Sequence, residues 1–232
     1  MNIRQTLKTL STAALFGALV GLTAPAIAAP IVTNGDFATG DFTGWSLGTV
    51  GANGTLGAAP YPRVTAANPL GAPFAAEFNV GRTTPSGSGE QGGSLTQIVF
   101  LPGGQIDFTA QIASVNPANA VQSYAGLFQV FIDGTLQAQI DLGAIAALAT
   151  ETAVLSFSNV FSAGNHSLQI TITRQALSLN APSSDLELDA SPRQYLTNVA
   201  LAVPEPGTIV LLLGGLAALV LMTARRRTQA AG

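Results

Sequence analysis

Apolar and polar residues alternate along much of the middle of the chain, and this period of two predicts β-strands. In 105–113, for example, Ile106, Phe108, Ala110 and Ile112 alternate with polar residues, so one face should be buried and the other hydrated. Similar runs predict further strands at 75–80, 94–101, 127–132, 136–142, 154–161, 167–173 and 195–203. This pattern, without a convincing amphipathic helix, predicts an all-β fold, most simply an antiparallel jelly-roll β-sandwich.

Turn-forming residues between these runs predict three hairpins, at Pro102-Gly103-Gly104, Asp133-Gly134 and Gly164-Asn165. Asp-Gly between alternating apolar residues is among the best short-range hairpin signals. The segments 45–73 and 82–93 are rich in turn formers and indicate loops, the first with one short strand. The pattern in 143–150 is ambiguous and is compatible with a short helix.

Both ends of the chain are apolar, and they predict different targeting segments. Residues 1–28 have a positive start at Arg4 and Lys8, an apolar middle and an Ala-x-Ala end at 26–28. These are the features of a secretory signal peptide, with cleavage expected after Ala28. An uncleaved membrane anchor is the alternative.

The apolar run at the other end, 207–224, is 18 residues without a charge. As a helix it would span about 27 Å, close to the hydrocarbon thickness of a bilayer. Arg225, Arg226 and Arg227 follow at once and should stay cytoplasmic. The pattern predicts a single transmembrane helix followed by a basic cytoplasmic tail, 225–232, with the 29–202 ectodomain on the other side of the membrane.

A short hinge, Val203-Pro204-Glu205-Pro206, precedes the apolar run. Its prolines should keep it extended and exposed. This ordered set of hinge, helix and arginines resembles the PEP-CTERM sorting signal of exported bacterial proteins. The resemblance implies a membrane-embedded exosortase as a partner that cuts near Pro-Glu-Pro, and delivery to the cell surface or the extracellular polysaccharide matrix.

Charge and composition narrow the function of the ectodomain. It holds four arginines, no lysine and eleven carboxylates, a net charge of −7, which argues against nucleic-acid binding because that requires basic patches. The chain has no cysteine, so disulfides and Cys-ligated metals are excluded. The only histidine, His166, should be exposed beside its turn and cannot form a His-based zinc site alone.

The opening Asn34-Gly35-Asp36-Phe37, continued by Asp41-Phe42-Thr43-Gly44-Trp45, resembles the start of galactose-binding-like jelly rolls. The closing 195–199 resembles their last strand. The resemblance implies the jelly-roll fold and a structural calcium near the first and last strands. Members often carry an acidic residue where this chain has Ala38 and an aspartate where it has Thr197.

Four aromatic residues are candidates for stacking on a sugar, because flat aromatic faces suit the apolar face of a pyranose: Trp45, Tyr61, Tyr124 and Tyr195. Trp45 is the better candidate for the core, given its place in the opening aromatic set. Asp185, Glu187 and Asp189 share one face of an extended segment. They could bind calcium, although a solvated strand face is the favoured interpretation.

No catalytic motif with a known mechanism occurs in the sequence, and a non-enzyme with no required cofactor is expected. The first hypothesis is an exported carbohydrate-binding protein acting on exopolysaccharide. The second is a structural or adhesive protein of the biofilm matrix without a discrete ligand site. An unrecognised hydrolase is the third.

Overall fold

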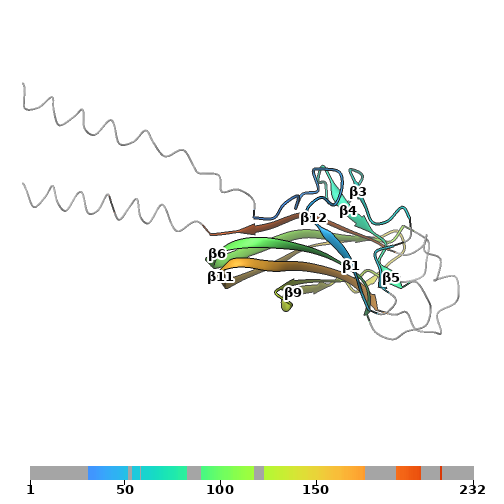
Figure 1. The fold of residues 1–232 in the computed structure, drawn as a ribbon. Coiled ribbons are helices and arrows are strands. Elements are labelled where there is room, and N and C mark those ends of the chain that lie inside the picture. The colour runs from blue at the N-terminus through green and yellow to red at the C-terminus, as the bar shows by residue number, and fades with distance from the viewer. Residues whose placement is uncertain are drawn as a thin grey trace, which may run out of the picture. The chain divides into compact units, whose positions relative to one another are not determined.

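The structure is a computed structural model that describes residues 31–51, 54–57, 59–82, 90–117, 123–175, 192–204 and position 215. Apart from position 215, the regular secondary structure of these residues is all β (Figure 1). The strands are β1 (Ser46–Val50), β2 (Gly54–Thr55), β3 (Arg63–Thr65), β4 (Ala75–Phe78), β5 (Gly81–Arg82), β6 (Glu90–Val115), β7 (Ser123–Tyr124), β8 (Leu127–Ile132), β9 (Thr135–Asp141), β10 (Ala144–Ile145), β11 (Thr150–Gln175) and β12 (Arg193–Ala202).

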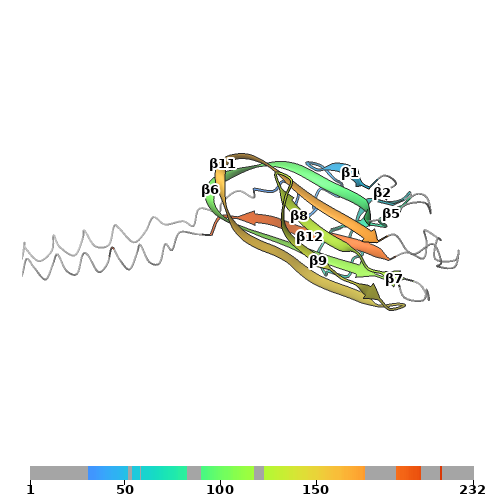
Figure 2. The same ribbon diagram turned by 90° about the horizontal axis from the view of Figure 1, so that it is seen from below.

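Two long strands, β6 and β11, organise the fold. Each has 26 residues, and they pair antiparallel from Glu90 opposite Gln175 to Val115 opposite Thr150. Figure 2 shows both strands curving over together. As a result the first half of β6 pairs with the second half of β11 in one layer, and the remaining halves pair in the other.

The other strands extend each layer through antiparallel pairing. One layer has the order β1, first half of β6, second half of β11, β8 and β9. The other has the order β3, β4, β12, second half of β6 and first half of β11. These layers form the antiparallel β-sandwich that the sequence predicted. Two short pairs, β2 with β5 and β7 with β10, lie outside them.

The predicted hairpins at 102–104 and 164–165 are wrong, because both segments are bends within β6 and β11. Gly104 lies opposite Phe161, and the pairing continues on both sides of the bend. Gly103 and Gly104 have φ of 86° and 91°, values that an L side chain rarely adopts. The buried apolar positions of β6 are odd-numbered before the bend and mainly even-numbered after it. The bend therefore lets both halves of one strand face the same core.

The predicted hairpin at Asp133-Gly134 is confirmed. It joins β8 to β9, with φ of 51° and 75° at its two turn residues. Positive φ at both positions is the backbone of a type I′ turn, whose twist matches that of the flanking strands. Strands β4 and β12 also lie at the predicted 75–80 and 195–203, with ends that differ by one or a few residues.

The segments expected to be irregular contain more strand than the sequence indicated. Residues 45–73 hold three short strands, β1, β2 and β3. Part of 82–93 belongs to β5 and β6. The short helix considered for 143–150 does not form, since these residues, all of them described, contain β10 and a turn.

The core lies between the two layers and draws on nearly every long strand. Its fully buried side chains include Phe78, Leu95, Ile106, Phe108, Ile112, Phe128, Leu155, Leu168, Ile170 and Leu196. The opening segment adds Phe37 and Trp45, which stack with ring centres 6.2 Å apart. Burial of large apolar side chains is the main source of stability in such a fold.

The opening segment is attached to the last strand at a bulge. The Val199 N–H donates to the Gly35 carbonyl over 2.9 Å, and the bulge falls between Thr197 and Ala200. A Cβ on Gly35 would lie 2.0 Å from the Val199 carbonyl oxygen, so only glycine allows this approach. The first and last parts of the domain are therefore held together by backbone contact.

Strand β12 ends at Ala202, directly before the hinge. Val203 and Pro204 are the last described residues of this segment. The rest of the hinge, the apolar run 207–224 apart from position 215, and the three following arginines lie outside the described residues. Within the part of the chain that is described, no helix has the length and apolar character needed to cross a membrane.

Candidate functional site

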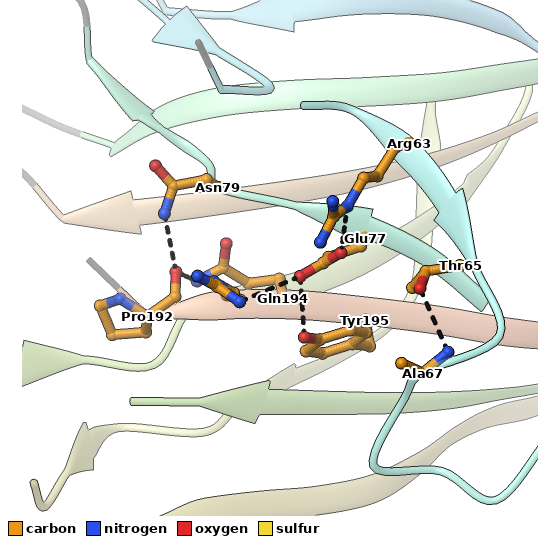
Figure 3. A network of polar contacts seen from close by, with 9 residues as sticks. Arg63, Thr65, Ala67, Glu77, Asn79, Pro192, Gln194 and Tyr195 are labelled. Atoms are coloured by element: carbon orange, nitrogen blue, oxygen red, sulfur yellow. Dashed lines mark hydrogen bonds and ion pairs between the residues drawn. The ribbon is translucent and has the colours of Figure 1, made fainter. Parts of the chain in front are cut away.

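Three strands at one side of a layer place a row of polar side chains on its outer face. In the register of β3, β4 and β12, Arg63 lies opposite Glu77, and Glu77 lies opposite Tyr195. Alternation along β4 and β12 sends Ala76 and Leu196 into the core, so the row points the other way. Figure 3 shows the side chains of Arg63 and Tyr195 converging on Glu77.

Glu77 is the centre of this row and is almost fully buried, with 1% of its side chain exposed. Arg63 Nε donates to Oε2 over 2.6 Å, and the Tyr195 hydroxyl donates to Oε1 over 2.9 Å. Arg193 Nη1 lies 3.7 Å from Oε1 as a second ion pair. A buried carboxylate is tolerated when it is both hydrogen-bonded and charge-paired, and this one satisfies both conditions.

These contacts fix the protonation of the partners. The hydrogen bond to Glu77 raises the pKa of Arg63. Burial, together with the bond to Glu77, raises the pKa of Tyr195 above its usual value. Tyr195 is therefore a neutral donor and Arg63 a cation at any physiological pH.

Tyr61 joins the same group from the loop before β3. The guanidinium carbons of Arg63 and Arg193 lie 5.4 Å and 5.9 Å from the centre of its ring, within the range of cation–π attraction. Gly57, with φ of 125°, lets the backbone lie close to the Tyr61 side chain. We name this group the arginine–tyrosine cluster; its members are Tyr61, Arg63, Glu77, Arg193 and Tyr195.

The loop between β3 and β4 adjoins the cluster at Tyr195. Asn68 organises this loop, since its side chain donates to the carbonyls of Ala66 and Ala72 and accepts from the Leu70 N–H. Leu70 packs against a small apolar group that contains Tyr195. Glu77 itself is almost fully buried, whereas the side chains of the two arginines are 43% and 35% exposed.

A second polar network lies at the start of β12, beside the cluster (Figure 3). The buried Gln194 amide donates to the carbonyls of Pro192 and Ala125 and accepts from the Val80 N–H. These bonds hold the first residues of β12, and therefore the backbone of Arg193, in a fixed position.

Arg174 is a buried cation in the same end of the domain. Its Nε donates to the Tyr124 carbonyl over 2.9 Å, and its Nη1 donates to the Val80 carbonyl over 3.5 Å. Burial lowers the pKa of Arg174 to about 10, so the side chain remains protonated at neutral pH. Tyr124, predicted as a stacking residue, is half-buried in β7, which is not one of the three strands of the row.

The other predicted site residues have different positions. Tyr61 lies in the cluster, but as the support of two guanidiniums. Tyr195 also lies there, but it is buried and its hydroxyl donates to Glu77. Trp45 is buried, and its Nε1–H donates to the Asn34 carbonyl over 3.1 Å. Its predicted place in the core is confirmed, and its ring is closed to a sugar. The three candidate calcium ligands lie outside the described residues: Asp185, Glu187 and Asp189.

Sequence reasoning missed Arg63, Glu77 and Arg193. Arg63 and Glu77 are 14 positions apart in the sequence, and only the strand register brings them together. One signal was present, because Glu77 is a single charge inside the mostly apolar run 75–80, and a covered carboxylate requires a cationic partner.

The prediction that His166 is exposed is wrong, because the residue is only 9% exposed. Its Nδ1 lies 2.7 Å from Asp133 Oδ2, and its Nε2 lies 3.0 Å from the Ser162 carbonyl oxygen. The bond to Asp133 is the main cause that raises the pKa of His166. The Ser167 N–H, followed by His166, lowers the pKa of Asp133. This pair ties the β8–β9 turn to the bend of β11.

The calcium implied by the galactose-binding-like resemblance does not fit the two diagnostic positions. Ala38 has no oxygen in its side chain, and the Thr197 hydroxyl donates to the Phe74 carbonyl over 2.7 Å. A hydroxyl already engaged as a donor replaces the carboxylate that hard cations prefer. In the described ranges no three His, Cys, Asp or Glu residues gather as a metal site.

Comparison with known proteins gives one match at the end of the chain. Residues 202–227 match the PEP-CTERM protein-sorting motif. This PEP-CTERM motif begins at the last residue of β12 and includes the hinge, the apolar run and the three arginines. It marks the chain as an exported protein sorted through the membrane, and it confirms the resemblance found in the sequence.

The ectodomain is similar to solved carbohydrate-binding domains only at a distance. TmCBM61 in complex with β-1,4-galactotriose shares 14% identity, with a TM-score of 0.45 over 76% of this chain and 100% of that one. The CBM22-1 xylan-binding domain of Paenibacillus barcinonensis Xyn10C shares 12%, with a TM-score of 0.35 over 70% and 86%. No curated protein matches the chain. At these scores the likeness does not identify a ligand.

Proposed function

We propose that this is an exported surface or matrix protein whose β-sandwich binds carbohydrate, without catalysis, at the arginine–tyrosine cluster. The observation that carries the proposal is the placement of two partly exposed guanidiniums around one buried carboxylate. Within the described residues, neither the Nη atoms of Arg63 nor the Tyr61 hydroxyl makes a hydrogen bond. Donors held in place in this way can bind sugar oxygens at a low cost in conformational entropy.

The sorting motif supports the export of this domain to the place where a polysaccharide would be met. The 207–224 helix would hold the chain in the inner membrane, with the three arginines that follow it in the cytoplasm. An exosortase would then cut near Pro204-Glu205-Pro206, and the domain would pass to the cell surface or the exopolysaccharide matrix.

A second candidate is a structural or adhesive role without a discrete ligand site. It is favoured by large apolar side chains on the outer faces of the layers, Ile98, Phe100, Val154 and Val160, which are 56% to 71% exposed. Exposed apolar groups of this kind can serve adhesive contacts with other surfaces.

A glycan array probed with the full chain in detergent, followed by calorimetry on the hits, tests the first proposal. Replacing Arg193 by glutamine should weaken binding at least about tenfold, because one charge-assisted hydrogen bond contributes about 1.5–3 kcal/mol. Val160→Ala, at the other end of the layer, is the control and should leave sugar binding unchanged. Failure to bind any glycan would rule out the first proposal, and loss of surface adhesion in Val160→Ala would favour the second.

A further inference from the structure

We infer that the arginine–tyrosine cluster selects sugars that carry a carboxylate, that is, uronic acids in an acidic polysaccharide. This inference rests on the proposed function, since it names the ligand class of the same site. It comes from three features of the cluster: its charge, the part of each guanidinium that Glu77 engages, and the position of the Tyr61 ring.

The local charge of the cluster opposes that of the domain around it. Two of the four arginines of 29–202 lie here with a single carboxylate, Glu77, giving a net charge of +1 in a domain of −7. Glu77 is 1% exposed, while each arginine side chain is at least one-third exposed. A ligand therefore meets the positive charges and not the negative one.

Each guanidinium keeps nitrogen atoms that Glu77 does not engage. Arg63 donates to Glu77 through Nε alone, and Arg193 reaches it only as an ion pair of 3.7 Å. The planar fork of an arginine matches the two oxygens of a carboxylate. A sugar hydroxyl offers a single oxygen, so the carboxylate is the sugar substituent that this geometry suits best.

The Tyr61 ring favours the same ligand class. Both guanidiniums lie over the ring, with their carbons 5.4 Å and 5.9 Å from its centre, and they occupy surface on which a neutral pyranose would stack. The ring instead holds the two cations close together, while its hydroxyl can add a bond to a ligand oxygen. Affinity should therefore come mainly from charge-assisted hydrogen bonds.

The net negative charge of the domain would repel an acidic polysaccharide at long range. At about 0.15 M salt the Debye length is about 8 Å, so long-range repulsion of an anionic polymer is largely screened while direct contacts at the cluster remain. Binding of the acidic sugar should then be measurable at physiological salt. It should weaken when salt is raised toward about 1 M, because partly exposed pairs are themselves screened.

The test is calorimetric titration of the full chain in detergent with three matched trisaccharides at about 0.15 M salt. These are trigalacturonate, its methyl ester, and the neutral galactose trimer. We expect trigalacturonate to bind at least about tenfold more tightly than its ester, the difference that one charge-assisted bond supplies. Arg193→Gln should remove this preference, and Arg193→Lys should keep part of it because the charge remains but the fork is lost.

The different failures of the test are distinguishable. Equal affinity for the acid and the ester would overturn the inference and leave carbohydrate binding intact. No binding of any of the three, together with a blank glycan array, would remove the proposed function itself. Thermal melts of both Arg193 variants identify any loss of folding, and the comparison of acid with ester in the unaltered chain needs no variant.

Discussion

The arrangement of the arginine–tyrosine cluster depends on the buried carboxylate of Glu77. It accepts from Arg63 and Tyr195 and pairs with Arg193, so side chains from two other strands depend on it. The sequence indicated that 75–80 is a strand but not that its carboxylate would be covered. The burial of Glu77 follows from its contacts with side chains of β3 and β12, and the period-two pattern does not predict which strands pair.

His166 makes the stability of the fold depend on pH. Its pKa is raised above 6.5 in the folded state. Its contribution to the free energy of unfolding is therefore complete below pH 6.5 and is lost as pH rises through the raised pKa. The pKa of Asp133 is lowered from 3.8, so its contribution is lost as pH falls through the lowered value. The pair should stabilise the protein most between about pH 4 and 6.5.

Substitution of His166 by glutamine tests this dependence. Urea unfolding followed between about pH 4 and 8.5 should show the largest loss of unfolding free energy below about pH 6.5 and a smaller loss at the alkaline end. Asp133→Asn should remove the same dependence on pH, and the double variant should add little to either single one. A loss that stays constant across this range would contradict the assignment.

At the scale of elements, the sequence predicted the positions of most strands, but two of the three predicted hairpin pairings were wrong. Pro102-Gly103-Gly104 has the composition of a hairpin turn, and in the structure it is a bend. Local composition shows where the chain changes direction, but not whether the next run pairs with the previous one. That choice is made by β11, which comes much later in the chain and pairs with both halves of β6. The Asp133-Gly134 hairpin was predictable because its partners adjoin its turn.

The glycines of the bend should therefore contribute to stability through their backbone conformation. Gly104 has φ of 91°, and nothing lies within 4 Å of the position that a Cβ would take, so alanine there meets strain and not collision. We expect Gly104→Ala to lower the unfolding free energy by about 1–2 kcal/mol, measured by urea unfolding. Gly103→Ala should cost more, because its Cβ would also lie 3.0 Å from the Ala163 nitrogen.

The control for the bend is Gln105→Ala, since Gln105 is exposed on the same strand and such substitutions usually change stability by less than about 0.5 kcal/mol. An unfolding free energy unchanged by Gly104→Ala would mean that the bend tolerates a side chain in this conformation.

At the scale of the whole molecule, the sorting motif was more predictable than the arginine–tyrosine cluster. The motif depends on the local order of hinge, apolar run and arginines, and the match to 202–227 confirms it; the signal peptide and the membrane-spanning helix stay predictions from local composition and length. The cluster depends on residues that the register of β3, β4 and β12 brings together, and nothing local to Arg63 or Arg193 distinguishes them from solvated arginines.

Sorting of the chain can be followed by intact mass. In cells with an active exosortase, the exported protein should lack the residues after the Pro204-Glu205-Pro206 region, because that segment is expected to be extended and open to the enzyme. In cells without the enzyme, the protein should keep Gly232 and remain with the membrane. Retention of Gly232 in the first cells would exclude processing at this hinge.

Strand β12 would have a mechanical consequence for as long as the chain is held in the membrane by its C-terminal segment, before any processing at the hinge. It is hydrogen-bonded to β4 on one side and to β6 on the other, it carries Arg193 at its start, and it leads directly into the hinge after Ala202. Tension between a bound polymer and the tether would run along this single strand and act on both ladders at once in shear. The load would be shared among their hydrogen bonds, so one strand would transmit force from the bound polymer to the membrane attachment.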